Sequence, residues 1–333
     1  MTPRSPAAQV VVGVDQGKSG TRALAWQNGH TVARHSVQGC RYEPGQHPSP
    51  SVLAGIVHSV HGLGLGSPPD VVAVGTAAGP AAGVESRRLA AAIRRATSAR
   101  RVVITEDVVT AYLGALGDCA GVVVAAGTGA VAMWTDGLQI RRSDGWGPLL
   151  GDEGSGYDIG RKALFAALAA SDGRGPATAL QRLAAEHLGG LDLRAVQRVH
   201  EAHDPVLILS GFVPMVIEAA SAGDGPARCI LQRAGRALAR TTAAAARPAI
   251  DSGDDVLAAH TGRLFGSQTL AESFRKECAL QGLTPIDPVG DSRSGAVLMG
   301  RGLYPMPFQG LVTEVGPESK GNLKQTDPCQ GTR

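Results

Sequence analysis

Two glycine-rich segments place hydroxyl and carboxyl groups where they could bind the phosphates of a nucleotide. The first follows an apolar run at residues 9–14 and consists of Asp15-Gln16-Gly17-Lys18-Ser19-Gly20-Thr21-Arg22. A carboxylate at a strand end can hold hydrated Mg²⁺, and the backbone N–H groups of a glycine-rich turn can bind phosphate oxygens. The second segment, Gly127-Thr128-Gly129, joins two further apolar runs and could act from the opposite side. The alternative for the first segment is a plain hairpin with an Asp-initiated turn.

The triplet Gly17-Lys18-Ser19 does not complete a P-loop. That motif needs four residues between its first glycine and its Gly-Lys pair, and a helix after them. Gly13 lies one residue too close to Gly17, and a strand is predicted after Ser19.

Asp107 follows directly after a predicted strand at residues 101–105. Active residues of α/β sheets usually lie at the carboxyl ends of strands. There, Asp107 could accept the proton of an attacking hydroxyl during phosphoryl transfer. The alternative is that it only caps the following helix.

The segment at residues 144–156 holds five glycines, one tryptophan and three carboxylates. This composition suits neither a core nor a solvated face. It predicts a fixed loop in which Asp152 or Glu153 binds sugar hydroxyls or Mg²⁺.

The predicted elements form a pattern that occurs twice. Strands at residues 9–14, 21–26 and 31–37 form a meander, with Asn28-Gly29 as a type I′ hairpin turn. A second hairpin with a glycine-rich tip begins at residue 121, which predicts two related halves. The remaining predicted elements are helices at 51–63, 86–96 and 108–116, strands at 71–75 and 101–105, a helical region at 157–246, a strand at 256–259, and helices at 267–281 and 294–302.

Composition and charge exclude several classes of protein. The formal net charge is only +3, and aromatic residues make up 4% of the chain, so neither nucleic acid nor an anionic membrane is an expected partner. No apolar run approaches the length of a membrane span, and the N-terminus lacks the apolar core of a signal peptide. The five cysteines are scattered without a CxxC pair, as is typical of reduced thiols. We therefore predict a cytoplasmic protein.

Four segments together resemble the N-acetylglucosamine kinase-like branch of the BadF/BadG/BcrA/BcrD ATPase family. They lie at residues 15–22, 104–107, 126–129 and 145–156, and the resemblance extends from about residue 9 to residue 302. It implies an α/β protein with the actin-like, hexokinase-like fold, in which two ribonuclease H-like domains hold ATP in the cleft between them. The corresponding division is an N-terminal lobe at residues 1–117, a C-terminal lobe at 118–303 and a flexible tail at 304–333.

The resemblance also implies a role for individual residues. Asp15 would bind Mg²⁺ through water, and Asp107 would be the general base. The residues that would contact ATP are Asp15, Gly17, Lys18, Ser19, Gly20, Thr21, Gly127, Thr128, Gly129 and Gly262. The residues that would contact the sugar are Thr76, Asp107, Gly145, Trp146, Asp152 and Glu153.

This chain departs from the family pattern in four places. Gln16-Gly17-Lys18 stands where relatives often have three glycines, and Ala259-His260 stands in place of Gly-Gly at the adenosine strand. Both departures concern the geometry of the nucleotide site. Ala130 replaces a frequent serine, and no asparagine occurs at residues 44–51. These two concern the identity of the sugar.

The sequence thus predicts an ATP- and Mg²⁺-dependent kinase that phosphorylates a hydroxyl, O6, of an amino sugar such as N-acetylglucosamine or glucosamine. One rival is a non-catalytic sugar or nucleotide sensor of the same fold. The other is an activator ATPase for a dehydratase, which would need cysteine ligands for an iron–sulfur cluster. The sequence leaves open which sugar is used and whether the chain forms a homodimer.

Overall fold

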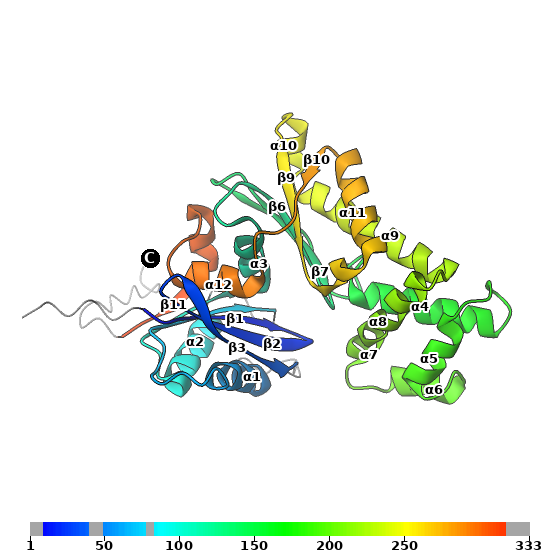
Figure 1. The fold of residues 1–333 in the computed structure, drawn as a ribbon, viewed down its shortest axis with the longest axis horizontal. Helices are drawn as coiled ribbons and strands as arrows, with labels where there is room; N and C mark the ends of the chain where they lie inside the picture. Colours follow the sequence, from blue (N-terminus) through cyan, green and yellow to red (C-terminus); the bar gives the residue numbers. More distant parts are fainter. Residues whose placement is uncertain (1–8, 40–48, 78–82, 318–333) are drawn as a thin grey trace, which may run out of the picture.

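The structure, a computed structural model, describes residues 9–39, 49–77 and 83–317. Two β-sheets stand on either side of a pair of helices, α3 (Asp107–Leu116) and α12 (Ser292–Gly300) (Figure 1). Each sheet is covered on its outer face by further helices.

The first sheet has six strands and combines a meander with parallel strands. In spatial order its strands are β11 (Thr313–Val315), β5 (Arg101–Glu106), β4 (Val71–Thr76), β1 (Val11–Gly17), β2 (Gly20–Gln27) and β3 (His30–Gln38). Strands β1, β4 and β5 are parallel, whereas β2, β3 and β11 are antiparallel to their neighbours. Asn28 and Gly29 both have positive φ, 53° and 88°, as a type I′ turn requires.

The second sheet has five strands in an equivalent arrangement. Its spatial order is β10 (Leu283–Pro285), β9 (Val256–Thr261), β6 (Gly121–Ala126), β7 (Ala130–Thr135) and β8 (Ile140–Asp144). The order β10-β9-β6-β7-β8 matches the order β5-β4-β1-β2-β3 of the first sheet, with the same parallel and antiparallel pairs. The predicted repeat of the glycine-tipped hairpin therefore corresponds to two related sheets.

Strand β1 is buried on both faces, which explains its continuous run of valines. Val12 and Val14 pack in a core with α1 (Pro50–His61) and α2 (Val84–Thr97). Val11 faces the other core, which α3 and α12 cover. A strand between two helical layers needs apolar side chains in both directions.

Helix α3 packs against both sheets. Tyr112 and Leu113 share one core with Val103 of the first sheet and with Val123 of the second. Gly114 of α3 and Gly295 of α12 allow a close crossing, because a Cβ added at Gly295 would lie 1.9 Å from the Thr110 carbonyl oxygen. The two helices thus join the lobes at the base of the space between them.

The second lobe carries a larger helical layer around a core of its own. Its helices are α4 (Gly156–Ser171), α5 (Leu180–Leu188), α6 (Leu193–His200), α7 (Pro205–Gly211), α8 (Val213–Ser221), α9 (Gly225–Ala245), α10 (Arg247–Asp251) and α11 (Gln268–Leu280). Two short 3₁₀ helices, η1 (Arg263–Gly266) and η2 (Met306–Leu311), complete the structure.

Two parts of the chain differ from the sequence prediction. The segment predicted as a flexible tail from residue 304 contains η2 and β11, because β11 pairs with β5 and Phe308 is fully buried against Tyr112. Helix α12 was assigned to the C-terminal lobe, but it packs on β1 and β4 of the first sheet. The chain therefore returns to the first lobe at its end. Residues 318–333 lie outside the described residues.

Within the described ranges, no single helix is both long and apolar enough to cross a membrane. One pair of segments bent by 116°, Pro205–Ser221 and Gly225–Ala245, reaches the required length and composition only when both are counted together.

Candidate active site

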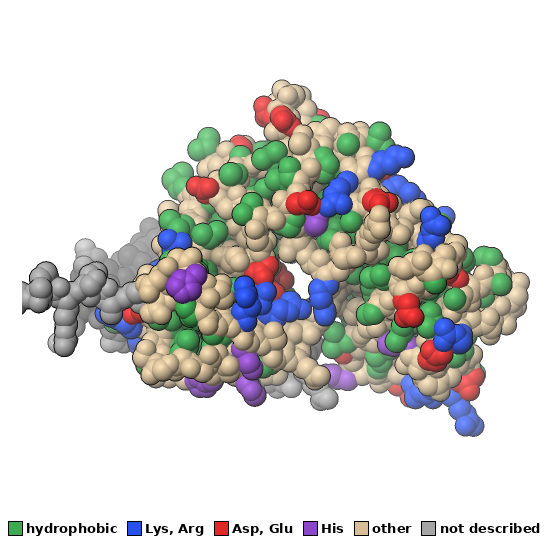
Figure 2. All heavy atoms as spheres, in the orientation of Figure 1, with side chains coloured by type: hydrophobic (Ala, Val, Ile, Leu, Met, Phe, Trp, Pro, Cys, Tyr) green, Lys and Arg blue, Asp and Glu red, His purple; other side chains and the backbone are tan. Residues whose placement is uncertain are grey.

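A cleft of ≈ 1250 Å³ lies between the two lobes and is lined by residues of both. Figure 2 shows the hollow between the two halves, with lysine, arginine and acidic side chains gathered around it. Asp15, Asp107 and Thr128, which lie far apart in the sequence, all line this one cleft.

The register of the parallel strands brings the acidic groups of the first lobe together. Asp15 of β1 lies beside Gly75 of β4, and Thr76 of β4 lies beside Glu106 of β5. Because all three strands end at the same edge, Asp15 and Asp107 face the cleft from one side. Arg22 donates a hydrogen bond to Asp15 at 3.2 Å.

Asp107 is the first residue of α3, while Glu106 occupies the N-cap position. Asp107 therefore does not occupy the N-cap position. The pKa of Asp107 is raised to about 6, mainly by burial and also by the negative charges of Asp15 and Glu106, while a backbone hydrogen bond from Val108 and the charge of Arg142 oppose the rise. A carboxyl group with a pKa near the working pH is suited to accept a proton.

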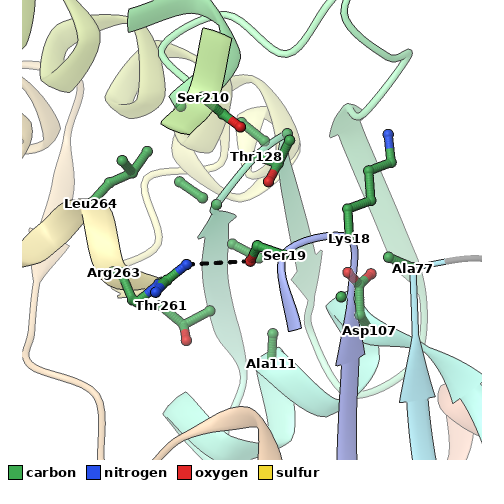
Figure 3. A pocket seen from close by; sticks show the side chains of 18 of the residues that line it. Lys18, Ser19, Ala77, Asp107, Ala111, Thr128, Ser210, Thr261, Arg263 and Leu264 are labelled. Atoms are coloured by element: carbon green, nitrogen blue, oxygen red, sulfur yellow. Dashed lines mark hydrogen bonds between the residues drawn. The ribbon is translucent and has the colours of Figure 1, made fainter. Parts of the chain in front are cut away.

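The first glycine-rich turn presents its tip to the cleft. Gly17, Lys18 and Ser19 line it, and Arg263 from the second lobe donates a hydrogen bond to the Ser19 hydroxyl at 3.3 Å (Figure 3). Strand β2 begins at Gly20, so no helix follows the lysine and the rejection of a P-loop is confirmed.

The second glycine-rich turn is held by the start of α4. The N–H of Gly156 donates to the carbonyl of Gly127 at 2.8 Å, and that of Tyr157 donates to the carbonyl of Thr128 at 3.1 Å. Gly262 packs directly behind this turn, because a Cβ at that position would lie 1.9 Å from the Ala126 carbonyl oxygen. With φ at 112°, position 262 also has a backbone conformation that favours glycine.

Asp144 organises the loop that was predicted to bind sugar. Its carboxylate accepts hydrogen bonds from the N–H groups of Gly145 and Asp152 at 2.8 Å and from that of Glu153 at 3.2 Å. Asp152 itself is buried and has a φ of 60°, which is uncommon for an aspartate. Burial raises the pKa of Asp152, while a backbone hydrogen bond from Ala130 and the charge of Lys18 oppose that effect.

The structure brings most of the predicted site residues together, but not all. Those that line the cleft are Asp15, Gly17, Lys18, Ser19, Asp107, Gly127, Thr128, Gly129, Gly145, Asp152 and Gly262. Those that are not among its lining residues are Gly20, Thr21, Thr76, Trp146 and Glu153.

The residues outside the lining have two kinds of position. Thr21 and Thr76 are buried, and Thr76 donates a hydrogen bond to the side-chain oxygen of Gln16 at 2.5 Å. Trp146 is 77% exposed, and Glu153 is also exposed. Thr76 thus supports the first glycine-rich segment through Gln16, whereas Trp146 and Glu153 lie at the surface of the loop that Asp144 organises.

The sequence analysis missed an apolar wall of the cleft. It consists of Leu207 of α7, Val213, Pro214 and Ile217 of α8, and Leu264 of η1. Helical spacing alone did not distinguish these side chains from those of a buried core. Arg142, Asp291 and Arg293, which also line the cleft, were missed too, since each lies outside the glycine-rich segments.

Comparison with proteins of known sequence gave one curated relative with a broad match. An N-acetylmuramic acid/N-acetylglucosamine kinase of Clostridium acetobutylicum is 29% identical over 209 residues, which cover 60% of this chain and 67% of that protein.

Solved structures support the same grouping. A proposed N-acetylglucosamine kinase from Chromobacterium violaceum is 27% identical with a TM-score of 0.67, covering 88% of this chain and 99% of that one. A ROK family glucokinase from Streptomyces griseus, in complex with glucose and AMPPNP, is 16% identical with a TM-score of 0.57 and covers the same shares. The latter is a likeness of fold, and the predicted two-domain actin-like, hexokinase-like fold is confirmed.

The sequence profile of one family matches residues 12–300, which include both sheets apart from β11, together with the helices between them. All the segments on which the resemblance rested lie inside this range. The chain belongs to the BadF/BadG/BcrA/BcrD ATPase family.

Proposed function

We propose that this protein is an ATP-dependent sugar kinase that transfers the γ-phosphoryl group of ATP to a hydroxyl, O6, of an amino sugar such as N-acetylglucosamine. The observation that carries the proposal is the position of Asp107, which lines the same cleft as Asp15 and both glycine-rich turns. The kinase names of the relatives support the choice of reaction and of substrate class.

The nucleotide would be held mainly by backbone groups. The N–H groups of the two turns, at residues 17–20 and 127–129, are suited to bind phosphate oxygens from opposite sides. Lys18 would add a positive charge at the first turn. The adenosine would lie by Gly262 and against the apolar wall, because aromatic bases gain from contact with aliphatic side chains.

Magnesium fits the chemistry of the first turn. Asp15 offers a carboxylate oxygen at the cleft, and Mg²⁺ is usually bound by one or two carboxylates together with substrate phosphates and waters. When bound, the ion would neutralise negative charge on the phosphates. Burial raises the pKa of Asp15, whereas the adjacent Arg22 lowers it and favours the ionised form that a metal needs.

Asp107 would act on the acceptor. As the sugar hydroxyl attacks the γ-phosphorus, Asp107 accepts its proton, a new O–P bond forms, and the bond from the γ-phosphorus to the oxygen of ADP breaks. With a pKa of about 6, the carboxylate is mostly ionised at neutral pH and can take up this proton.

The sugar would be held by the loop that Asp144 organises. Asp152 and the backbone at Gly145 line the cleft, and both are fixed by hydrogen bonds to Asp144. Trp146 and Glu153 would join the site only if the loop moves toward the bound sugar. The cytoplasmic location and the choice of O6 remain predictions from the sequence.

The test is a panel of acceptors with ATP and Mg²⁺, in which ADP release is measured. The panel contains N-acetylglucosamine, glucosamine, N-acetylmuramic acid, glucose and a no-sugar control. We expect release to accelerate with one or more amino sugars far above the no-sugar rate. No acceleration with any acceptor would refute the kinase and favour the sensor.

A further inference from the structure

One arginine of the second lobe makes contacts on both sides of the cleft. Arg142 of β8 donates a hydrogen bond to the Glu106 carboxylate at 2.9 Å and another to the Gly145 carbonyl at 3.3 Å. Glu106 belongs to the first lobe and precedes Asp107, whereas Gly145 begins the loop that Asp144 organises. A single guanidinium group therefore links the start of α3 to that loop.

The local structure is built around this guanidinium group. A Cβ added at Gly145 would lie 2.6 Å from Nη2 of Arg142, so a larger residue there would displace the guanidinium group from its present position. Gly145 has a φ of 77°, which also favours glycine. The Arg142 side chain is 44% exposed and that of Glu106 is 25% exposed, so the pair lies at the rim of the cleft and not in a core.

We propose that Arg142 is a positioning residue, which holds the sugar-binding loop at Gly145 against the start of α3 so that the bound sugar meets Asp107. This inference rests on the proposed function, since it assigns a role within the same site. A planar guanidinium with several fixed donors can bond two acceptors at once, which an ammonium group does less well. If Arg142 and Glu106 formed only an ordinary surface ion pair, removal of Arg142 would leave the loop unchanged, because exposed ion pairs contribute little to stability.

The link that Arg142 makes between Glu106 and Gly145 matters because it connects the two lobes. Asp107 is carried by the first lobe and the sugar-binding loop by the second, so any change in their separation displaces the acceptor from its base. Small displacements of reacting groups have large effects on rate. Arg142 spans this separation at Glu106, the residue before Asp107, whereas the Arg263 contact across the cleft is made to Ser19 of the first glycine-rich turn.

The first experiment is amide hydrogen exchange on the protein without ligands, for Arg142→Ala, Glu106→Gln and the control Arg141→Ala. Arg141 lies on the same strand, is exposed and does not line the cleft. We expect the amides of residues 145–147 and 149–151 to exchange several-fold faster in the first two variants and at the wild-type rate in the control. Unchanged exchange in both would overturn the proposal, even if the protein is an active kinase.

The second experiment is steady-state kinetics with the best acceptor of the panel. We expect Arg142→Ala to lower kcat/KM for the sugar roughly tenfold, because the acceptor is displaced from Asp107, while KM for ATP stays near the wild-type value. The double variant Glu106→Gln/Arg142→Ala should be no worse than Arg142→Ala alone, because one contact is removed in both. Additive losses, or an equally large rise in KM for ATP, would contradict the bridge. A wild-type protein inactive on every sugar would instead refute the kinase itself.

Discussion

The two lobes have the same sheet topology but contribute different chemistry to the cleft. The first lobe contributes charged side chains, namely Asp15, Lys18 and Asp107. The second lobe contributes the turn at residues 127–129, which hydrogen bonds from α4 hold in place, together with Asp152, Arg142 and the apolar wall. The proposed metal ligand and general base thus lie on the first lobe, and the loop proposed to hold the sugar lies on the second.

This difference predicts whether a substitution in each lobe changes binding, turnover or stability. The charges of the first lobe lie at strand ends that face the cleft, so their removal should alter binding or turnover and leave the fold intact. Gly262 of the second lobe is in backbone contact with Ala126 of β6, so its replacement should damage stability and binding together. The following predictions test that contrast, beginning with the largest effect.

Replacement of Asp107 by asparagine should reduce kcat about a hundredfold or more, because the acceptor hydroxyl loses its general base. The free energy of unfolding and the affinity for ATP should stay near the wild-type values. Turnover is measured by ADP release and nucleotide affinity by calorimetry. Asp118→Asn, at an exposed position after α3, is the matched control. Near-normal turnover in Asp107→Asn would refute the assignment of the base.

Replacement of Gly262 by alanine should lower the free energy of unfolding by roughly 1–3 kcal/mol, because the new Cβ meets the Ala126 carbonyl and the φ is unfavourable. Nucleotide binding should weaken in the same variant, since the turn in front of it must shift. Denaturant unfolding measures the first effect. Gly266→Ala is the control, because a Cβ there meets nothing within 4 Å. Equal stability of the two variants would show that the contact is not tight.

Replacement of Lys18 by alanine should raise KM for ATP roughly tenfold, which is the size expected for the loss of one hydrogen bond to a charged group. KM for the sugar and the unfolding free energy should change little. Lys276→Ala, an exposed lysine of α11, is the control. A variant that binds ATP as tightly as the wild type would place the phosphates away from Lys18.

The smallest predicted effect is on pH dependence. The pKa of about 6 for Asp107 predicts that kcat/KM falls as the pH drops below about 6, because the base becomes protonated. Removing the positive charge in Arg142→Ala should move this limb to higher pH. Removing the negative charge in Glu106→Gln should move it to lower pH, and Asp15 remains as a second negative neighbour in both. Shifts in the same direction would contradict this electrostatic account.

The sequence predicted those parts of the fold that depend on local signals. The Asn28-Gly29 turn, the buried valines of β1 and the position of Asp107 after β5 all follow from residue types within a short window. The glycines of the two turns were identifiable for the same reason, since tight turns restrict the residues that can form them.

What could not be predicted depends on contacts between distant segments. Strand β8 has exposed arginines at its centre and lacks an apolar pattern, so only its pairing with β7 defines it. Strand β11 has three residues and exists because β5 offers an open edge. The apolar wall of α7 and α8 and the bridge from Arg142 to Glu106 likewise require the lobes to be placed relative to each other.

The central claim is that Asp107 faces the acceptor hydroxyl in a cleft that also holds the phosphates. The most direct test is a crystal structure with a non-hydrolysable ATP analogue and N-acetylglucosamine. We expect a sugar hydroxyl within about 3 Å of the Asp107 carboxylate, and the γ-phosphate between the turns at residues 17–20 and 127–129. A sugar bound elsewhere, with Asp107 in contact with neither substrate, would contradict the account.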